Sequence, residues 1–167
     1  MYSLKLYDET LIKFDMDNKI TLKVSNIEIV SNDKKMYPEA LQEEVTPDTI
    51  KEFLEQRIIP KNRTFVKNIL EAKDLDLKDV KGVIDVSKGL SLTDCYWIVS
   101  DDNLKFKDYN LYDNNFSRVL SLVAFVGNSK KIKNAILSPE FTTDGALPKA
   151  WRRINEKVYL YKGSTEY

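Results

Sequence analysis

Apolar residues alternate with polar ones along the N-terminal part of the chain, and this alternation constrains the fold more than any other feature. Leu4 and Leu6 lie two positions apart, and an apolar run over residues 11–14 follows a polar break. Two further alternating runs cover residues 20–24 and 27–29. Because side chains of a strand point alternately to its two faces, the pattern predicts short strands that pair as a small antiparallel meander.

A strong helix start signal follows. Thr46 can cap exposed backbone amides, Pro47 fits the first helical position, and Asp48 complements the helix dipole. We expect this helix to end before Pro60, because a proline ring breaks a helix interior. A second helix is expected over residues 62–73, where apolar residues form one stripe, and the two helices would form a hairpin packed against the meander.

Three segments in this half have weaker signals. Residues 31–44 are polar, and we expect a surface loop or an irregular sheet edge there. Residues 83–86 are mostly apolar and predict a short buried segment. Residues 95–99 have the composition of a strand, although residues 91–94 could instead start a helix, and both alternatives stay open.

The C-terminal third contains an apolar run and a hairpin signal. Residues 116–126 are nearly all apolar and predict a buried helix that stops at Gly127, because glycine readily takes the left-handed conformation that ends a helix. Residues 150–154 and 157–161 flank a polar dipeptide, which indicates a compact β-hairpin. Together with the meander, these elements predict an α+β fold.

One stretch has the composition of a linker. Residues 128–139 are polar and rich in Ser, Lys and Asn. We therefore expect an N-terminal α+β domain over residues 1–127 and a second unit over residues 140–167, which contains the hairpin.

Charge and composition narrow the classes of function. The 26 Lys and Arg residues balance 26 Asp and Glu residues, which argues against a protein that coats nucleic acid or binds membranes through a basic surface. The chain has no histidine, so a histidine-based metal site, general base or nucleophile pair is excluded. The single cysteine, Cys95, lies in an apolar context and predicts a buried, inert thiol. We find no signal peptide and no apolar run near the ~20 residues of a membrane span, so we expect a cytoplasmic protein.

Aromatic residues gather in the middle of the chain and allow two interpretations. They are Tyr96, Trp97, Tyr109, Tyr112 and Phe116. Stacking on nucleic-acid bases would need a basic excess around them, which this stretch does not have. Core packing is therefore the favoured interpretation.

One loop and one strand end carry the candidate binding residues. Within residues 142–149, Gly145 and Ala146 stand in a polar turn, and Lys149 follows the glycine four positions later. Such a turn can direct backbone amides at an anion, and the lysine adds a mobile positive charge. On the motif alone an ordinary turn is favoured, because the two-glycine spacing of known phosphate loops is missing. Lys162, at the end of the second hairpin strand, can reach a phosphate in that turn or simply face solvent.

Four stretches resemble a known family. Residues 141–153 (FTTDGALPKAWRR) and 158–163 (VYLYKG) resemble the start of the kinase portion of HipA-like Ser/Thr protein kinases. Residues 89–97 (GLSLTDCYW) and 109–117 (YNLYDNNFS) resemble a subgroup found in Gram-positive bacteria and their mobile elements. The likeness covers most of the chain from about Ile59 onward.

The resemblance implies a role for each candidate residue. Gly145, Ala146 and Lys149 match the family's glycine loop, which covers the phosphates of ATP. Lys162 matches the strand lysine that contacts them. ATP and magnesium are therefore the implied cofactors, and the hairpin is the start of a kinase N-lobe. The commoner family loop has glutamine where this chain has Leu147.

Three hypotheses of function follow. We expect residues 1–167 to lack the C-terminal lobe that carries the catalytic aspartate and the magnesium ligands, so we assign no catalytic and no metal-binding residue. The chain would then be a regulatory or scaffolding portion that needs the missing lobe or a protein partner, in a toxin–antitoxin or phage system. The second hypothesis is a non-enzymatic module that completes or inhibits a partner kinase through the free edge of its hairpin. A weaker third is a nucleic-acid-binding regulator with basic patches at residues 130–133 or at Lys149, Arg152 and Arg153, although the balanced charge argues against direct binding.

Overall fold

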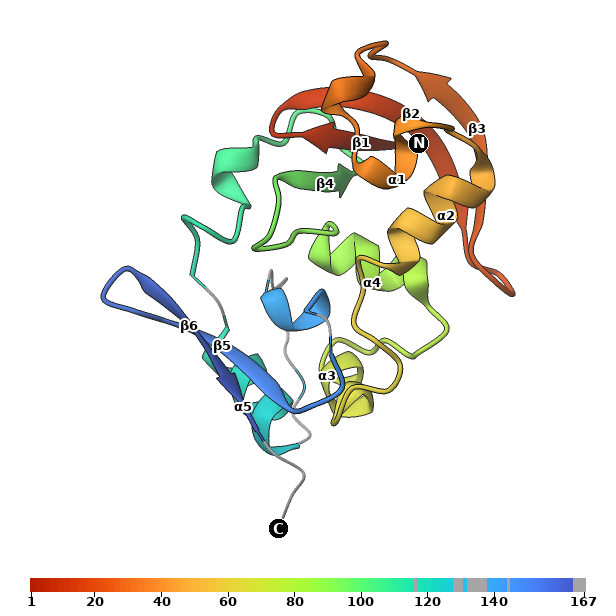
Figure 1. Cartoon of the computed structure of the whole chain (residues 1–167). Helices are drawn as coiled ribbons and strands as arrows, with labels where there is room; N and C mark the ends of the chain where they lie inside the picture. Colours follow the sequence, from red (N-terminus) through yellow and green to blue (C-terminus); the bar gives the residue numbers. More distant parts are fainter. Residues whose placement is uncertain (116, 128–130, 132–137, 144, 164–167) are drawn as a thin grey trace.

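The strands form a four-stranded antiparallel sheet and a separate two-stranded hairpin (Figure 1). The computed structural model describes residues 1–115, 117–127, 131, 138–143 and 145–163. Within these residues, four strands form the sheet in the order β3-β2-β1-β4. They are β1 (Tyr2–Leu6), β2 (Glu9–Asp17), β3 (Lys23–Ile29) and β4 (Tyr96–Val99). The predicted α+β class and the predicted meander are confirmed, and the segment around residues 95–99 is a strand that pairs with β1.

Short helices connect and cover the strands. They are α1 (Glu39–Gln42), α2 (Pro47–Glu55), α3 (Val66–Glu71), α4 (Val80–Ser87) and α5 (Arg118–Val126), with the 3-10 turns η1 (Lys34–Met36), η2 (Phe106–Asp108) and η3 (Pro139–Phe141). The start of α2 is as predicted. The Thr46 hydroxyl accepts from the Thr49 amide at 3.2 Å, and the Thr49 hydroxyl oxygen accepts from the Thr46 amide at 2.9 Å.

Two segments differ from the sequence predictions. The stretch 31–44 is more than a loop, because η1 and α1 form there and bury Tyr37 and Leu41. The helix predicted over residues 62–73 is shorter, since α3 begins only after Phe65. The backbone of Phe65 is left-handed, with φ of 63°, and cannot belong to a right-handed helix.

Buried apolar residues of the described part form three clusters. The first fills the space between the sheet and α2 and includes Ile84 of α4. The second joins α3, α5 and Phe141 and includes Val83, so α4 contributes to both clusters and contains the predicted buried segment 83–86. The third lies around Trp97. Because α2 and α3 belong to different clusters, they do not pack as the predicted helical pair against the meander.

The C-terminal part is a two-stranded hairpin that packs against α5. Strands β5 (Lys149–Ile154) and β6 (Lys157–Lys162) pair across Asn155 and Glu156, which confirms the predicted hairpin. The left-handed Gly127, with φ of 78°, ends α5 as predicted. This helix is buried on one face only, so the prediction of a buried helix holds in part. Its exposed apolar residues are Val119, Leu122, Phe125 and Val126.

Some predictions concern residues outside the described part of the chain. Most of the predicted linker 128–139 and Phe116 fall there, and the division into units 1–127 and 140–167 stays a prediction. Among the described residues, no helix combines the length and the apolarity that a membrane span requires.

Candidate anion-binding site

The two predicted lysines face each other across the hairpin. Lys149 opens β5 and Lys162 closes β6, and the two residues are direct partners in the hairpin register. Because opposite residues of an antiparallel pair point to the same face, both side chains project from one side of the hairpin. Together with Trp151 and Leu160, which are partners on that same face, they line a cavity of about 310 Å³, which we call the lysine cavity.

Residues from other parts of the chain complete this cavity. They are Gln56, Arg57, Ser91, Leu92, Thr93, Pro139, Thr142 and Thr143. Arg57 donates from its two terminal nitrogens to the carboxylate of Asp94, at 2.7 and 2.8 Å, so its charge is already paired. No carboxylate is among the described residues that line the cavity. Besides Arg57, the cationic residues that line the cavity are Lys149 and Lys162.

The two lysines differ in exposure. Lys149 is only 7% exposed, and its ammonium donates to the carbonyl of Leu147 at 3.4 Å. Lys162 is exposed to solvent. An exposed lysine keeps its rotamer freedom and can move toward a ligand, whereas a buried one stays in place. Lys162 is thus suited to meet an incoming anion, whereas the buried Lys149 stays in place beside it.

Gly145 lets the loop approach Lys149 closely. Its backbone lies in the left-handed region, with φ of 95°, and a Cβ atom there would come within 2.4 Å of Lys149 Nζ. Any other residue would displace the ammonium and strain the backbone. Gly145 and Ala146 are exposed, and neither is among the described residues that line the cavity. Of the four predicted residues, Lys149 and Lys162 line the cavity, and Gly145 lies next to the Lys149 ammonium.

A buried arginine that the sequence did not single out holds this loop. Arg63 is 2% exposed and donates hydrogen bonds to the carbonyls of Thr143 and Gly145. The amide and the hydroxyl of Thr64 both donate to the carbonyl of Ala146, at 2.8 and 2.9 Å. Arg63 and Gly145 are 82 positions apart, so no local sequence signal could have found this contact.

A buried carboxylate, also missed from the sequence, fixes the position of β5. Glu140 has no exposed surface and accepts from the Trp151 amide at 2.8 Å and from the Ser121 hydroxyl at 3.1 Å. The Ser138 hydroxyl donates to it as well. Burial raises the pKa of Glu140, although these donors favour the charged form. Because Ser121 belongs to α5, Glu140 ties β5 to that helix.

The central aromatic residues serve mainly as core. Trp97 is fully buried, its indole N–H donates to the Tyr7 carbonyl at 2.6 Å, and its ring centroid lies 5.7 Å from that of Phe106. The predicted core packing is confirmed for Trp97, whereas Tyr112 is exposed. Cys95 is half-buried, so the prediction of a buried thiol is wrong in degree.

Two remaining sequence predictions concern metals and basic patches. The described residues contain no group of three His, Cys, Asp or Glu side chains that could hold a metal ion. Of the patch 130–133, only Lys131 is described, and it forms an ion pair with Asp74.

Comparison with known proteins gives no further information on the function of this site. No family model matches the chain, and no similar curated protein or solved structure was found. The function has to be inferred from the chemistry of the site.

Proposed function

We propose that this chain is the N-terminal portion of a HipA-like Ser/Thr kinase and that its lysine cavity holds the phosphates of ATP. The observation that carries the proposal is the hairpin register, because it sets Lys149 beside Lys162 on the face of the hairpin that lines the cavity. Gly145, the glycine of the matching loop, supports it by leaving room for the Lys149 ammonium.

The proposed roles follow from exposure and position. Lys162 would bind phosphate oxygens directly, and Lys149 would add a fixed second charge. ATP, when bound, supplies the phosphoryl group, and the residues of this chain hold and orient it. Leu147 is 41% exposed where the commoner family loop has glutamine, so binding here would depend on the lysines more than on the loop side chains.

We assign no magnesium ligand in this chain, because the described residues that line the cavity include no carboxylate. We infer that phosphoryl transfer needs residues from a C-terminal lobe or from a protein partner. The role of this chain would then be regulatory or scaffolding, in a cytoplasmic toxin–antitoxin or phage system.

Calorimetric titration of the chain with ATP, with and without magnesium, tests this function. Lys162→Ala is expected to weaken ATP binding by about tenfold or more, because a hydrogen bond to a charged group contributes roughly 1.5–3 kcal/mol. Lys157→Ala is the matched control: it removes a lysine from the same strand, but Lys157 pairs with Ile154 on the opposite face of the hairpin. This control should bind ATP like the unchanged chain.

Titrations with inorganic triphosphate and with adenosine show which part of ATP the chain binds. Triphosphate should bind and adenosine alone should bind much more weakly, since the site is built around the phosphates. Failure to bind ATP at millimolar concentration, or equal losses for Lys162→Ala and Lys157→Ala, would contradict the proposal.

A further inference from the structure

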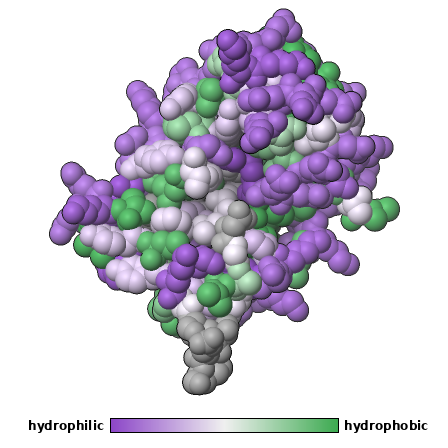
Figure 2. All heavy atoms as spheres, viewed as in Figure 1, coloured by the Kyte–Doolittle hydropathy of each residue, from purple (hydrophilic) through white to green (hydrophobic). Residues whose placement is uncertain are grey.

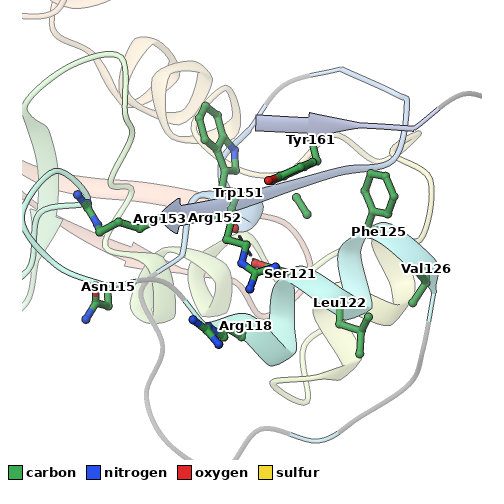
Figure 3. A pocket seen from close by; sticks show the side chains of 11 residues that line it. Asn115, Arg118, Ser121, Leu122, Phe125, Val126, Trp151, Arg152, Arg153 and Tyr161 are labelled. Carbon is green, nitrogen blue, oxygen red and sulfur yellow. Dashed lines mark hydrogen bonds between the residues drawn. The ribbon is translucent and has the colours of Figure 1, made fainter. Parts of the chain in front are cut away.

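A second and larger cavity lies between α5 and the hairpin (Figure 3). Its volume is about 660 Å³. It is lined by Asn115, Arg118, Ser121, Leu122, Phe125, Val126, Ala150, Trp151, Arg152, Arg153 and Tyr161. We call it the α5 groove. Apart from Trp151, its lining residues differ from those of the lysine cavity, so the proposed phosphate site does not account for it.

One end of the α5 groove is apolar. Leu122, Phe125 and Val126 are spaced along one face of the helix and are 44%, 36% and 48% exposed. Tyr161 of β6, 45% exposed, adds an aromatic ring from the hairpin. Figure 2 shows hydrophobic residues mixed with hydrophilic ones around the hairpin, whereas the surface over the sheet is mostly hydrophilic. A set of large apolar side chains around one hollow is typical of an interaction site.

The other end of the α5 groove is cationic. In Figure 3 the arginines lie toward one end, and Phe125 and Val126 lie toward the other. Arg153 donates to the carbonyls of Leu111 and Tyr112 and is thereby held in place. Arg118 and Arg152 are exposed and form no ion pair with any carboxylate in the described part of the chain.

Two features strengthen the preference of this end for negative charge. Arg118 is the first residue of α5, where the helix dipole adds a partial positive charge. No Asp or Glu is among the described residues that line the groove. The groove thus presents positive charge and apolar surface in a fixed order along one nine-residue helix, which is about 13 Å long.

We propose that the α5 groove docks an amphipathic segment of a partner protein, with carboxylates at one end and large aliphatic or aromatic residues at the other. The charge pattern of the groove selects this occupant. A second copy of the chain would bring the same arginines to the interface, and like charges repel. A nucleic acid would set its phosphates over Leu122 and Phe125, which cannot pair with them. An acidic amphipathic segment satisfies both ends at once.

Fluorescence anisotropy with the full chain tests the proposal. The probe is a labelled helical peptide of about three turns, with Glu and Asp in its first turn and Leu at positions that share one face. Saturable binding that weakens with salt is expected. Arg152→Glu should reduce the affinity at least tenfold, and Leu122→Ser should do the same through the apolar end. Lys19→Glu and Ile20→Ser, which change exposed side chains far from the groove, are the matched controls and should leave the affinity unchanged.

Each other outcome overturns the proposal. A peptide with Lys in place of Glu and Asp that binds equally well would show that charge does not select the occupant. Light scattering that gives a dimer, dissociated by Leu122→Ser, would make a second copy the occupant. Binding of single-stranded DNA that Arg152→Glu abolishes would assign the groove to nucleic acid. Circular dichroism of both groove variants checks that they fold. Absence of peptide binding to the unchanged chain would also refute the proposal.

Discussion

Arg57 shows how one buried cation orders several segments at once. Its Nε donates to the Gly89 carbonyl at 2.8 Å, its terminal nitrogens bind the Asp94 carboxylate, and its guanidinium lies 5.2 Å from the ring of Phe53. It also donates to the Tyr96 carbonyl at 3.0 Å. This side chain therefore holds the segment 89–96, part of which lines the lysine cavity, to the residues that follow α2.

Replacing Arg57 by lysine should destabilise the protein. Lysine keeps the charge but cannot reproduce the planar fork that reaches Asp94 and both carbonyls, so the free energy of unfolding should fall by about 2–4 kcal/mol. Urea unfolding followed by circular dichroism measures the change. Lys131→Ala, which removes an exposed ion pair with Asp74, is the control and should leave the midpoint unchanged. Equal midpoints for Arg57→Lys and the unchanged chain would contradict the assigned role.

Glu140 makes stability depend on pH in a defined direction. Because burial raises its pKa above the ordinary 4.5, the folded protein holds this proton to higher pH than the unfolded chain does. Its contribution to the free energy of unfolding is greatest below pH 4.5 and declines as pH rises through the raised value. The lowered pKa values of Asp15 and Asp102 act in the opposite direction, so only a comparison of variants isolates Glu140.

Glu140→Gln and Glu140→Ala separate charge from hydrogen bonding. Glutamine keeps an acceptor for the Trp151 amide and removes the charge, so the variant should gain stability relative to the unchanged chain as pH rises. Alanine leaves buried donors unpaired and should lower the free energy of unfolding by roughly 2–4 kcal/mol at any pH. Urea unfolding at several pH values between 4 and 8 provides the measurement. A constant difference between Glu140→Gln and the unchanged chain across that range would contradict the raised pKa.

At the scale of elements, the turn of the C-terminal hairpin carries strain that a single change can relieve. Asn155 and Glu156 both have positive φ, at 48° and 68°. A two-residue turn of this kind favours Asn followed by Gly, because glycine takes the left-handed conformation without steric cost. Glu156→Gly should raise the free energy of unfolding by about 1 kcal/mol. Lys157→Gly, one position later within β6, should lower it, and urea unfolding compares the two. A loss of stability in Glu156→Gly would rule out this strain.

Elements with local signals could be predicted from the sequence. The cap at Thr46, the stop at Gly127 and the hairpin turn each depend on a few adjacent residues, and the structure confirms them. The start of α3 could not be predicted, because nothing in the sequence forces the left-handed backbone of Phe65. The exposure of one face of α5 could not be predicted either, since an apolar run does not say which of its faces finds a partner.

At the scale of the whole molecule, some residues of the candidate site could be predicted from the sequence and others could not. Lys149 and Lys162 could be paired from the sequence, because the short turn fixes the hairpin register. The residues that hold the site, Arg63 and Glu140, could not be found, since both act through contacts with residues distant in the chain. Charged residues next to apolar ones in a sequence are usually exposed, and only the fold shows that these two are buried.

The Arg63 contacts predict that the hairpin unfolds together with the rest of the protein. Arg63 and Thr64 bind the carbonyls of Thr143, Gly145 and Ala146, and Phe141 lies in the cluster formed by α3 and α5. These contacts join the loop that precedes β5 to residues of the N-terminal half, whereas the polar stretch 128–139 predicts a linker between the two parts. One cooperative transition is expected.

The two tryptophans report on the two parts separately. Trp97 lies in the cluster on β4 and Trp151 lies on β5, so Trp151→Phe and Trp97→Phe each leave one fluorescent probe. Within each variant, the urea midpoint from fluorescence should equal the midpoint from far-UV circular dichroism. Arg63→Met leaves the loop carbonyls without their donor and should lower the midpoint of Trp151 fluorescence more than that of Trp97. With Arg63 in place, Trp151 fluorescence could still change at a lower urea concentration than Trp97 fluorescence. That result would make the hairpin an independent unit, as the linker predicts. Its contacts with Arg63 and Glu140 would then be too weak to couple it to the core.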